Sequence, residues 1–381
     1  MRNLQKRTWA QISLRNIEHN YKTMKARLGI GTRFLGIVKA DAYGHGAGRV
    51  AGLLEQLGCA YLGVACIDEA LALREDGITL PILVMGYTSP QLTAELLDND
   101  LTQTIYSADM ADAYSKQAVL AGKLLKTHLK VDTGMGRLGF TCGRGRDPEA
   151  DMLCVLALPG LSYEGIYTHF AVSDVRGDLF TNQQFDVFRD LVERLEDKSG
   201  RQFLIKHCAN SGAMINCDWS YFDMVRPGLS LYGHYPGKDT GGLELKPAME
   251  LKTRIAQVKD YNAGDTVSYG RTFTVTEKRR LAVITIGYAD GLFRTLSGKV
   301  DVLVRGRRTR QVGRICMDMC MIDVSDIPDA EIGDVVTIFG RDGKAFISVE
   351  ELAESAGTVS YELLCAVSPR VPRVYQENAT T

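Results

Sequence analysis

The sequence predicts an α/β protein, a (β/α)8 TIM-type barrel followed by a mainly β C-terminal domain. Short apolar runs alternate with helical patterns eight times in the first two thirds of the chain, which is typical of this barrel. After Pro247, short β-type runs broken by Gly, Asp and Asn turns replace that alternation. A length of 381 residues accommodates one barrel and a second domain.

The barrel strands are expected at short apolar runs that are bounded by turn residues. These runs are Phe34–Ala40, Tyr61–Ala65, Pro81–Gly86, Leu101–Tyr106, Thr127–Asp132, Tyr163–His169, Phe203–Ala209 and Phe222–Gly228. Between them, Ile67–Glu75 and Asn182–Lys198 carry apolar residues at helical spacing, whereas Ser211–Cys217 is at best a short helix. An open, doubly wound sheet of eight strands would show the same alternation, so strand counting leaves it as an alternative.

The second domain is expected to be mainly β because its apolar runs are short and closely spaced. The β-type runs lie around Val258, Val267 and Val275 and at Ala282–Ile286, Val300–Val304, Met321–Val324 and Val335–Phe339. Only Val349–Ser355 and Ser360–Cys365 look helical. The connecting segment Tyr235–Lys246 contains Pro236 and several glycines, so we place one domain at residues 1–240 and the other at residues 241–381.

The composition indicates a soluble globular protein without a nucleic-acid or membrane partner. The net charge is -1, with 45% hydrophobic and 24% charged residues. The start MRNLQKRTWAQ lacks the apolar core of a signal peptide, and no apolar run approaches the length of a membrane span. The nine cysteines are irregularly spaced, which argues against a disulfide framework and against a zinc site. We therefore expect a cytoplasmic protein that binds no metal.

Polar residues gather where the predicted strands end, which is where barrel enzymes carry their chemistry. Five of the eight strands contribute, with Lys39; Lys130, Asp132 and Arg137; His169; His207, Asn210 and Ser211; and Arg226 with Gly228. Singly, each group has an ordinary explanation. Lys39 could extend its ammonium into water, and Asn210 with Ser211 could cap a helix. His169 could be a core histidine, and Arg226 could be a surface charge in a turn. However, chance alone would rarely place all of these polar residues at the same rim of the barrel.

Two groups at this rim suit a phosphate. The Ser211 hydroxyl and the backbone amide of Gly228 follow strands seven and eight, where barrels commonly bind phosphate. A lysine beside such a site, in a chain without metal signals, suggests a Schiff base to pyridoxal phosphate (PLP). The chain contains no GxxxxGK[ST] motif, so nucleotide binding is the weaker explanation of a phosphate site.

Eight motifs in a fixed order then indicate a family. They are VKADAYGHG (Val38–Gly46), KVDTGMGRLG (Lys130–Gly139), THFAVSD (Thr168–Asp174), ANSGA (Ala209–Ala213), RPGLSLYG (Arg226–Gly233), VSYGRTF (Val267–Phe273), GYADG (Gly287–Gly291) and GRICMDM (Gly313–Met319). With these motifs the chain resembles the alanine racemases, fold-type III PLP enzymes, over essentially its whole length. The resemblance implies the same barrel and β domain, and a racemase that interconverts L-alanine and D-alanine and supplies D-alanine for peptidoglycan.

The resemblance also implies roles for individual residues. Lys39 matches the PLP-binding lysine and one of two acid/base residues. Tyr269 matches the opposite base, which reaches the active site of the partner chain, so a homodimer with shared active sites is implied. PLP contacts are implied for Tyr43, His169, Asn210, Ser211, Arg226, Gly228, Leu229 and Tyr361, with Arg226 at the ring nitrogen and His169 against the ring. Arg137 and the backbone amide of Met317 match the contacts to the substrate carboxylate.

The remaining matches support the site or line its entrance. Lys130, His207, Cys316 and Asp318 are supporting residues, and Asp174, Tyr288, Arg294 and Arg314 lie where the family builds its substrate entrance. Two bases suit the reaction because a proton leaves one face of the α-carbon and returns to the other. Lysine and tyrosine ordinarily have pKa values near ~10, so positive charges in the site must favour tyrosinate and neutral lysine. His207 and Arg226 are the candidates to polarise Tyr269, and Lys130 is a candidate for carbamylation beside Arg137.

The rival hypotheses are other PLP proteins. A serine or broad-specificity amino-acid racemase of the same family is the nearest alternative, although serine racemases of vancomycin resistance also carry a membrane domain that is not seen here. Basic amino-acid decarboxylases of the same fold type use an acid at the ring nitrogen, where this chain has Arg226. A PLP-carrier protein resembles the barrel alone, and the second domain with Tyr269 argues against it.

Overall fold

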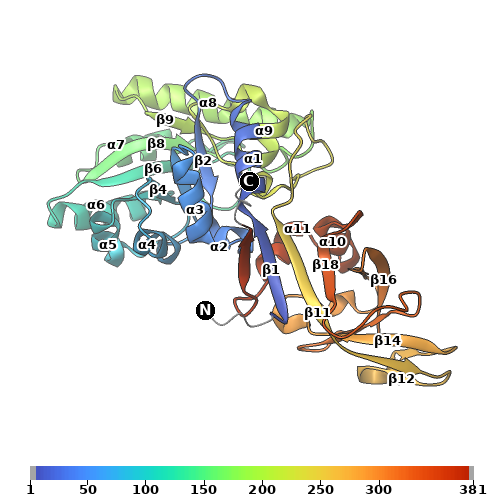
Figure 1. Cartoon of the computed structure of the whole chain (residues 1–381). Coiled ribbons are helices and arrows are strands. Elements are labelled where there is room, and N and C mark those ends of the chain that lie inside the picture. Colours follow the sequence, from blue (N-terminus) through green and yellow to red (C-terminus); the bar gives the residue numbers. More distant parts are fainter. Residues whose placement is uncertain (1–5, 377–381) are drawn as a thin grey trace. The chain divides into compact units, whose positions relative to one another are not determined.

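The computed structural model describes residues 6–376, which divide into two compact units. The barrel unit comprises Ile17–Ala42 and Ala47–Lys246. The β unit comprises the N-terminal segment up to Asn16, Tyr43–Gly46 and the chain from Pro247 onward. In Figure 1 most of the β unit is orange and red, and the barrel unit runs from blue to yellow. Among the described residues, no helix is both long enough and apolar enough to cross a bilayer.

Eight parallel strands form the sheet of the barrel unit, in the order β10-β2-β3-β4-β5-β6-β8-β9. Their bounds are β2 (Arg33–Ile37), β3 (Tyr61–Val64), β4 (Ile82–Val84), β5 (Leu101–Ile105), β6 (Leu125–Asp132), β8 (Leu161–Tyr167), β9 (Ile205–His207) and β10 (Met224–Val225). The outer strands are joined by backbone hydrogen bonds, since Asp223 N–H donates to the Lys206 oxygen at 3.0 Å and Arg226 N–H to the Ala209 oxygen at 2.8 Å. The sheet is therefore closed, so the predicted barrel is confirmed and the open-sheet alternative is wrong.

The strands read as apolar runs because both faces of a closed parallel sheet are covered. All four residues of β3, for example, are buried. Figure 1 shows helices outside these strands. The helices of this part of the chain are α1 (Leu14–Lys25), α3 (Ala47–Gln56), α4 (Ile67–Glu75), α5 (Thr93–Asp98), α6 (Ala108–Leu120), α7 (Glu149–Leu156), α8 (Leu179–Ser199) and α9 (Ser211–Asn216). Local chemistry sets their ends: Asp178 accepts from Phe180 N–H at the start of α8, and Gly200, with φ +65°, ends it.

The β unit is built on a sheet of nine strands in the order β19-β18-β15-β16-β17-β14-β11-β1-β20. Strand β18 also pairs with β11, so six of the strands close into a ring. The bounds are β1 (Thr8–Ser13), β11 (Met249–Tyr261), β14 (Arg279–Ile284), β15 (Asp301–Val304), β16 (Arg307–Val312), β17 (Cys320–Asp323), β18 (Val335–Asp342), β19 (Ala345–Ile347) and β20 (Arg373–Gln376). The prediction of a mainly β second domain is confirmed.

Smaller elements complete the two units. In the β unit these are the hairpin β12 (Thr266–Val267) with β13 (Phe273–Thr274), and the helices α10 (Val349–Ala356) and α11 (Ser360–Ala366). In the barrel unit, β7 (Phe140–Thr141) pairs with β6. Strand β1 was not predicted, and it pairs antiparallel with β11 and parallel with β20. Its membership in the β sheet depends on partners more than 200 residues away, which local sequence patterns do not reveal.

Candidate functional site

Lys39 begins a left-handed turn, α2 (Lys39–Gly44), directly after strand β2. The φ angles of Ala40–Tyr43 lie between +52° and +53°, and Gly44 has φ +78°. Non-glycine residues in this conformation cost about 1–2 kcal/mol each, because Cβ crowds the following carbonyl oxygen. Strain of this kind concentrates at functional sites. The turn therefore favours a functional role for Lys39 over a lysine that merely reaches water.

One carboxylate bonds to the start of this turn, and a second, within the turn, bonds to the helix that follows it. Glu69, on α4, accepts from the backbone N–H of Ala40 at 2.6 Å and from that of Ala65 at 2.7 Å. Asp41 accepts from the backbone N–H of Ala47 at 2.8 Å. Hydrogen bonds from N–H groups to carboxylates are among the stronger ones in proteins, so they offset part of the strain.

Asp132 organises the loop that carries Arg137. It ends strand β6, and its carboxylate accepts from the backbone N–H groups of Gly134 and Gly136 at 3.0 Å and of Arg137 at 3.1 Å. Gly139 lies so close that a Cβ there would come within 2.5 Å of the Asp132 nitrogen. The buried carboxylate of Asp132 therefore fixes the backbone of Arg137, five residues later in the chain. The Arg137 side chain itself is exposed.

The buried guanidinium of Arg226 is held by its Nη atoms. Nη1 donates to His207 Nδ1 at 2.8 Å, and Nη2 donates to the carbonyl oxygens of Thr168 at 2.7 Å and Cys208 at 3.2 Å. Nη2 also lies 3.4 Å from His169 Nδ1. The Arg226 Nε–H is buried and has no hydrogen-bond partner among residues 6–376. Arginine offers only donors, so this atom can serve one further acceptor.

Arg226 fixes the tautomers of two buried histidines. Because it donates to His207 Nδ1, the His207 proton is on Nε2, which donates to His128 Nδ1 at 2.9 Å. His128 then carries its proton on Nε2, a buried atom without a partner in the described part of the chain. Tyr167 stacks on His207 with ring centroids 4.7 Å apart. Gly165 makes room for His128, because a Cβ there would lie 2.7 Å from the imidazole.

Burial and positive charge keep these imidazoles neutral. Burial, followed by Arg226, lowers the pKa of His128 to about 3. The same two causes hold the pKa values of His169 and His207 well below the ordinary range. Burial, followed by the nearby arginines, also lowers the pKa of Lys130 to about 8. The site therefore combines permanent guanidinium charge with neutral imidazoles and a lysine that is partly neutral near physiological pH.

Ser211 begins α9, opposite the segment Gly228–Ser230. Its hydroxyl oxygen accepts from Gly228 N–H at 2.9 Å and lies 3.5 Å from Ser230 N. Asn210 caps α9 through its side chain, and Leu229 starts the 3-10 helix that carries Ser230. The Ser230 hydroxyl is buried and has no partner in the described chain. Two backbone N–H groups thus converge on one hydroxyl, an arrangement that suits phosphate oxygens.

In the β unit, Tyr269 lies on a strained turn. Ser268 has φ +67°, Gly270 +72° and Arg271 +50°. The Tyr269 side chain is 70% exposed. A hydrophobic cluster fixes the strands that flank the turn, and its buried members are Val267, Val275, Leu281, Val312 and Met321. Strain combined with exposure indicates that Tyr269 is presented for contact rather than for packing.

The loop Cys316–Met319 borders the same pocket as Tyr269, which has a volume of about 540 Å³. The Ser268 hydroxyl donates to the Arg314 oxygen at 2.7 Å and so connects the Tyr269 turn to the chain that leads into this loop. Gly287 packs directly beneath the loop, because a Cβ there would collide with the carbonyl oxygens of Cys316 and Met317. The first glycine of the GYADG motif is therefore required by close backbone approach.

Each unit holds a part of the predicted site. The barrel unit contains Lys39, Lys130, Arg137, His169, Asp174, His207, Asn210, Ser211, Arg226, Gly228 and Leu229. The β unit contains Tyr43, Tyr269, Tyr288, Arg294, Arg314, Cys316, Met317, Asp318 and Tyr361. Tyr43 and Tyr361 lie together, with ring centroids 5.9 Å apart, and burial, followed by Tyr361, raises the pKa of Tyr43.

Known families match both parts of the chain. The alanine racemase N-terminal domain matches residues 12–236, and the alanine racemase C-terminal domain matches residues 248–375. The chain belongs to the alanine racemase family. The alanine racemase of Desulfosudis oleivorans is 47% identical, over 96% of this chain and 96% of the relative. That of Desulforamulus reducens is 45% identical, over 96% of this chain and 98% of the relative.

Solved alanine racemases have the same fold. The enzyme of Clostridium difficile 630 superposes with a TM-score of 0.93 at 39% identity, covering 99% of this chain and 97% of that one. The Bacillus anthracis enzyme with bound L-Ala-P gives 0.92 at 34% identity, with the same coverage. The resemblance drawn from the eight motifs is thus confirmed, together with the fold that it implied.

Three residues of the site were not predicted from the sequence. Glu69 bonds to the turn of Lys39, while His128 and Tyr167 pack on or bond to His207. His128 and Tyr167 lie inside strands that were predicted as apolar runs. A polar residue within a buried strand was the signal that could have identified both. Glu69 carries no such signal, because an acidic residue in the first turn of a helix is ordinary.

Proposed function

We propose that this chain is a PLP-dependent racemase that interconverts L-alanine and D-alanine. It acts as a cytoplasmic homodimer and supplies D-alanine for peptidoglycan. Membership of the alanine racemase family supports the reaction class, and a solved relative with bound L-Ala-P supports a small amino-acid substrate. The observation that carries the cofactor assignment is the buried Arg226 Nε–H, a donor left over after the other guanidinium atoms are bonded.

The residues of the barrel unit fit PLP. Lys39 would hold the cofactor covalently, the Arg226 Nε–H would donate to its ring nitrogen, and Ser211 with the N–H groups of Gly228 and Ser230 would hold its phosphate. When bound, PLP supplies an electron-withdrawing ring that makes the α-hydrogen of the amino acid acidic. A guanidinium does not give up its proton, so a ring nitrogen facing Arg226 stays unprotonated. Electron withdrawal is then limited, which disfavours side reactions such as transamination.

Two residues would exchange protons with the substrate. Lys39 serves one face of the α-carbon, and Tyr269 of the partner subunit serves the other. Both types of side chain are ordinarily protonated at neutral pH, so nearby positive charge must favour their basic forms. Arg137 and the Met317 N–H would hold the substrate carboxylate and thereby orient the α-hydrogen toward one base or the other.

Two measurements test this function. Borohydride reduction of the purified protein followed by peptide mapping should place a pyridoxyl label on Lys39, and a label on Lys130 or Lys206 instead would contradict the cofactor site. In deuterated water, L-alanine should exchange its α-hydrogen and racemise while retaining its carboxylate. Loss of the carboxylate would indicate a decarboxylase, and a labelled protein without exchange would indicate a PLP carrier.

Alanine is expected to be a better substrate than serine. The resemblance places Tyr269, Tyr361 and Met317 around a site with room for little more than a methyl group. Discrimination by pocket size is modest, about 1–3 kcal/mol per added group, so serine should react about 10- to 100-fold more slowly rather than not at all. Chiral analysis of products from a panel of L-amino acids measures the ratio, and serine turnover equal to that of alanine would favour the broad-specificity alternative.

Lys130 is expected to be carbamylated by carbon dioxide. The reaction joins the neutral amine to CO2 and releases one proton, and a pKa of about 8 leaves a usable neutral fraction at pH 7. An ammonium here would repel Arg137, whereas a carbamate would accept its hydrogen bonds and orient it. In ¹³C-bicarbonate, a carbamate carbon signal should appear in the wild type and be absent from Lys130→Ala, whose KM for alanine should rise about tenfold.

Lys126 provides the matched control for this prediction. It lies on the same strand, β6, but its ammonium pairs with Asp100 at 2.7 Å. Lys126→Ala should keep both the carbamate signal and the KM of the wild type. Intact activity and KM in Lys130→Ala would contradict a role for the modification, and no ¹³C signal in the wild type would contradict the modification itself.

A further inference from the structure

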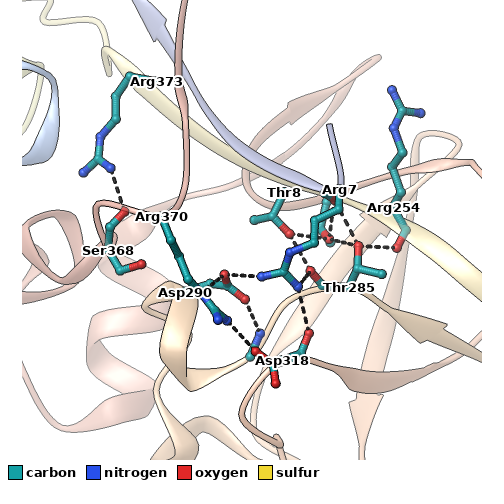
Figure 2. Close-up of polar contacts among 11 residues, drawn as sticks. Arg7, Thr8, Arg254, Thr285, Asp290, Asp318, Ser368, Arg370 and Arg373 are labelled. Carbon is teal, nitrogen blue, oxygen red and sulfur yellow. Dashed lines mark hydrogen bonds and ion pairs between the residues drawn. The ribbon is translucent and has the colours of Figure 1, made fainter. Parts of the chain in front are cut away.

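The β unit contains a fully buried carboxylate, Asp290, that takes no part in the chemistry proposed above. Its side chain has 0% exposure. Asp290 Oδ1 accepts from Arg7 Nη2 at 2.5 Å and from Arg370 Nε at 2.8 Å, and Oδ2 accepts from Gly287 N–H at 3.0 Å (Figure 2). A buried carboxylate is costly unless it is paired and bonded, so these three donors explain how it is tolerated. They do not explain what it is for.

Both arginines extend from Asp290 to the loop Cys316–Met319. Arg370 Nη2 donates to the Asp318 carboxylate at 2.8 Å, and Arg7 Nη1 lies 3.2 Å from the Asp318 carbonyl oxygen. Figure 2 shows the two guanidinium groups between the two aspartates. A guanidinium can bond two acceptors at once with fixed geometry, so each arginine joins Asp290 to Asp318.

The segment that carries Asp290 also bonds to the carbonyl groups of the two residues before Asp318, Cys316 and Met317. Tyr288 N–H donates to the Cys316 oxygen at 3.0 Å, and Ala289 N–H donates to the Met317 oxygen at 3.0 Å. With the contact from Arg7 to Asp318, three successive carbonyl oxygens of the loop accept from the two residues before Asp290 and from its ion-pair partner Arg7.

Peptide geometry then sets the direction of the N–H groups. The described chain has no cis peptide bond, and in a trans peptide the N–H points opposite to the C=O. The N–H groups of Met317 and Asp318 therefore both point away from the Asp290 side. Within residues 6–376, neither donates to a backbone carbonyl oxygen. Successive N–H groups that point the same way form an anion-binding arrangement, and both residues border the pocket of Tyr269.

We propose that Arg7, Asp290 and Arg370 are positioning residues for the substrate carboxylate. They hold the loop so that the N–H groups of Met317 and Asp318 form a pair that receives the carboxylate of the amino acid. None of the three touches the substrate. This inference rests on the proposed function, and it adds the Asp318 N–H to the carboxylate-binding groups and names the buried ion pairs that orient it.

Arg370 offers the sharpest test because its side chain is 42% exposed and can be changed without opening a large cavity. Arg370→Met removes both hydrogen bonds, and Arg370→Lys can restore one. In the PLP-loaded enzyme, Arg370→Met should raise KM for both alanine enantiomers about tenfold while kcat changes less than about threefold. Arg370→Lys should give an intermediate value. Affinity for propionate, which is alanine without its amino group, should fall by the same factor, and affinity for ethylamine, which has no carboxylate, should not change.

Arg305→Met is the matched control. Arg305 also belongs to the β unit and also binds several carboxylates, Asp329, Glu331 and Asp334, none of which belongs to the loop. Hydrogen exchange read by mass spectrometry should show faster exchange of residues 287–291 and 313–320 in Arg370→Met only. Arg305→Met should leave that exchange and the ratio of propionate to ethylamine affinity as in the wild type.

The outcomes separate this inference from the proposed function. If the wild type neither racemises alanine nor binds propionate, the proposed function fails, while the exchange data still decide whether Arg370 orders the loop. If the wild type does both and Arg370→Met lowers thermal stability without changing the ratio of propionate to ethylamine affinity, the ion pairs are only structural and the inference is overturned. Unchanged exchange of residues 313–320 in Arg370→Met would overturn it as well.

Discussion

Lys39→Ala and Tyr269→Ala homodimers should each lose activity by about a hundred- to ten-thousand-fold, the usual contribution of a positioned acid or base. Mixing and refolding the two variants should restore about a quarter of wild-type activity. If each site takes Lys39 from one chain and Tyr269 from the other, a heterodimer has one site with both changes and one site with neither. Random pairing makes half of the dimers mixed, and half of their sites are intact.

The exposure of Tyr269 motivates this expectation. In a single chain its side chain is 70% exposed, and Met317 beside the same pocket is 53% exposed. If Tyr269 and Met317 serve as the proposed base and carboxylate contact, they need a surface that shields them from water, and a two-fold dimer would cover both sites with one arrangement.

The control for the mixing experiment replaces Tyr269→Ala by a chain with both changes. When that chain is mixed with Lys39→Ala, no site contains a lysine at position 39, so no activity should return. Native mass spectrometry verifies that heterodimers form. If heterodimers form from the two single variants and activity stays at the homodimer level, Tyr269 acts within its own chain and the shared site is rejected.

A fall from pH 5.5 to pH 4.5 should lower the free energy of unfolding by about 1.4 kcal/mol through His128 alone, and His169 and His207 should lower it further in the same direction. His128 has its pKa lowered to about 3, and His169 and His207 are lowered well below the ordinary range, mainly by burial and then by Arg226. In the unfolded chain each titrates near ~6.5. Below that pH the unfolded state binds up to three more protons than the folded state, so stability falls as pH falls.

Urea unfolding at a series of pH values measures this slope. His128→Asn keeps an acceptor for the His207 Nε2–H but cannot titrate, so its slope should be smaller by about 1.4 kcal/mol per pH unit. Thr104→Val is the matched control, because Thr104 bonds to buried Tyr167 in the same core without titrating in this range. It should lower stability at every pH and leave the slope unchanged. A slope in His128→Asn equal to that of the wild type would show that His128 is not a buried neutral imidazole.

Much of the fold could be predicted from the sequence because its signals are local. Each barrel strand is a short apolar run, and each exposed helix has a period near 3.6 residues, so the element order and the change after Pro247 are visible without coordinates. The position of Lys39 at the end of a strand is local in the same sense. The family motifs around Arg137, Arg226 and Tyr269 identify residue types and spacing, which are also properties of short segments.

Tertiary structure decided what depends on residues far apart in the chain. Barrel closure is visible only in hydrogen bonds between the outer strands, such as that from Arg226 N–H to the Ala209 oxygen. The tautomer of His128 likewise depends on a distant residue, because Arg226 sets it through His207. The Arg7–Asp290 pair joins residues separated by 283 positions. A charged residue looks the same in a sequence whether it is solvated or buried, since its cost depends on partners that only the folded chain supplies. The left-handed turn after Lys39 was equally hidden, because it opposes the local preference of its alanines and persists only while the surrounding fold holds it.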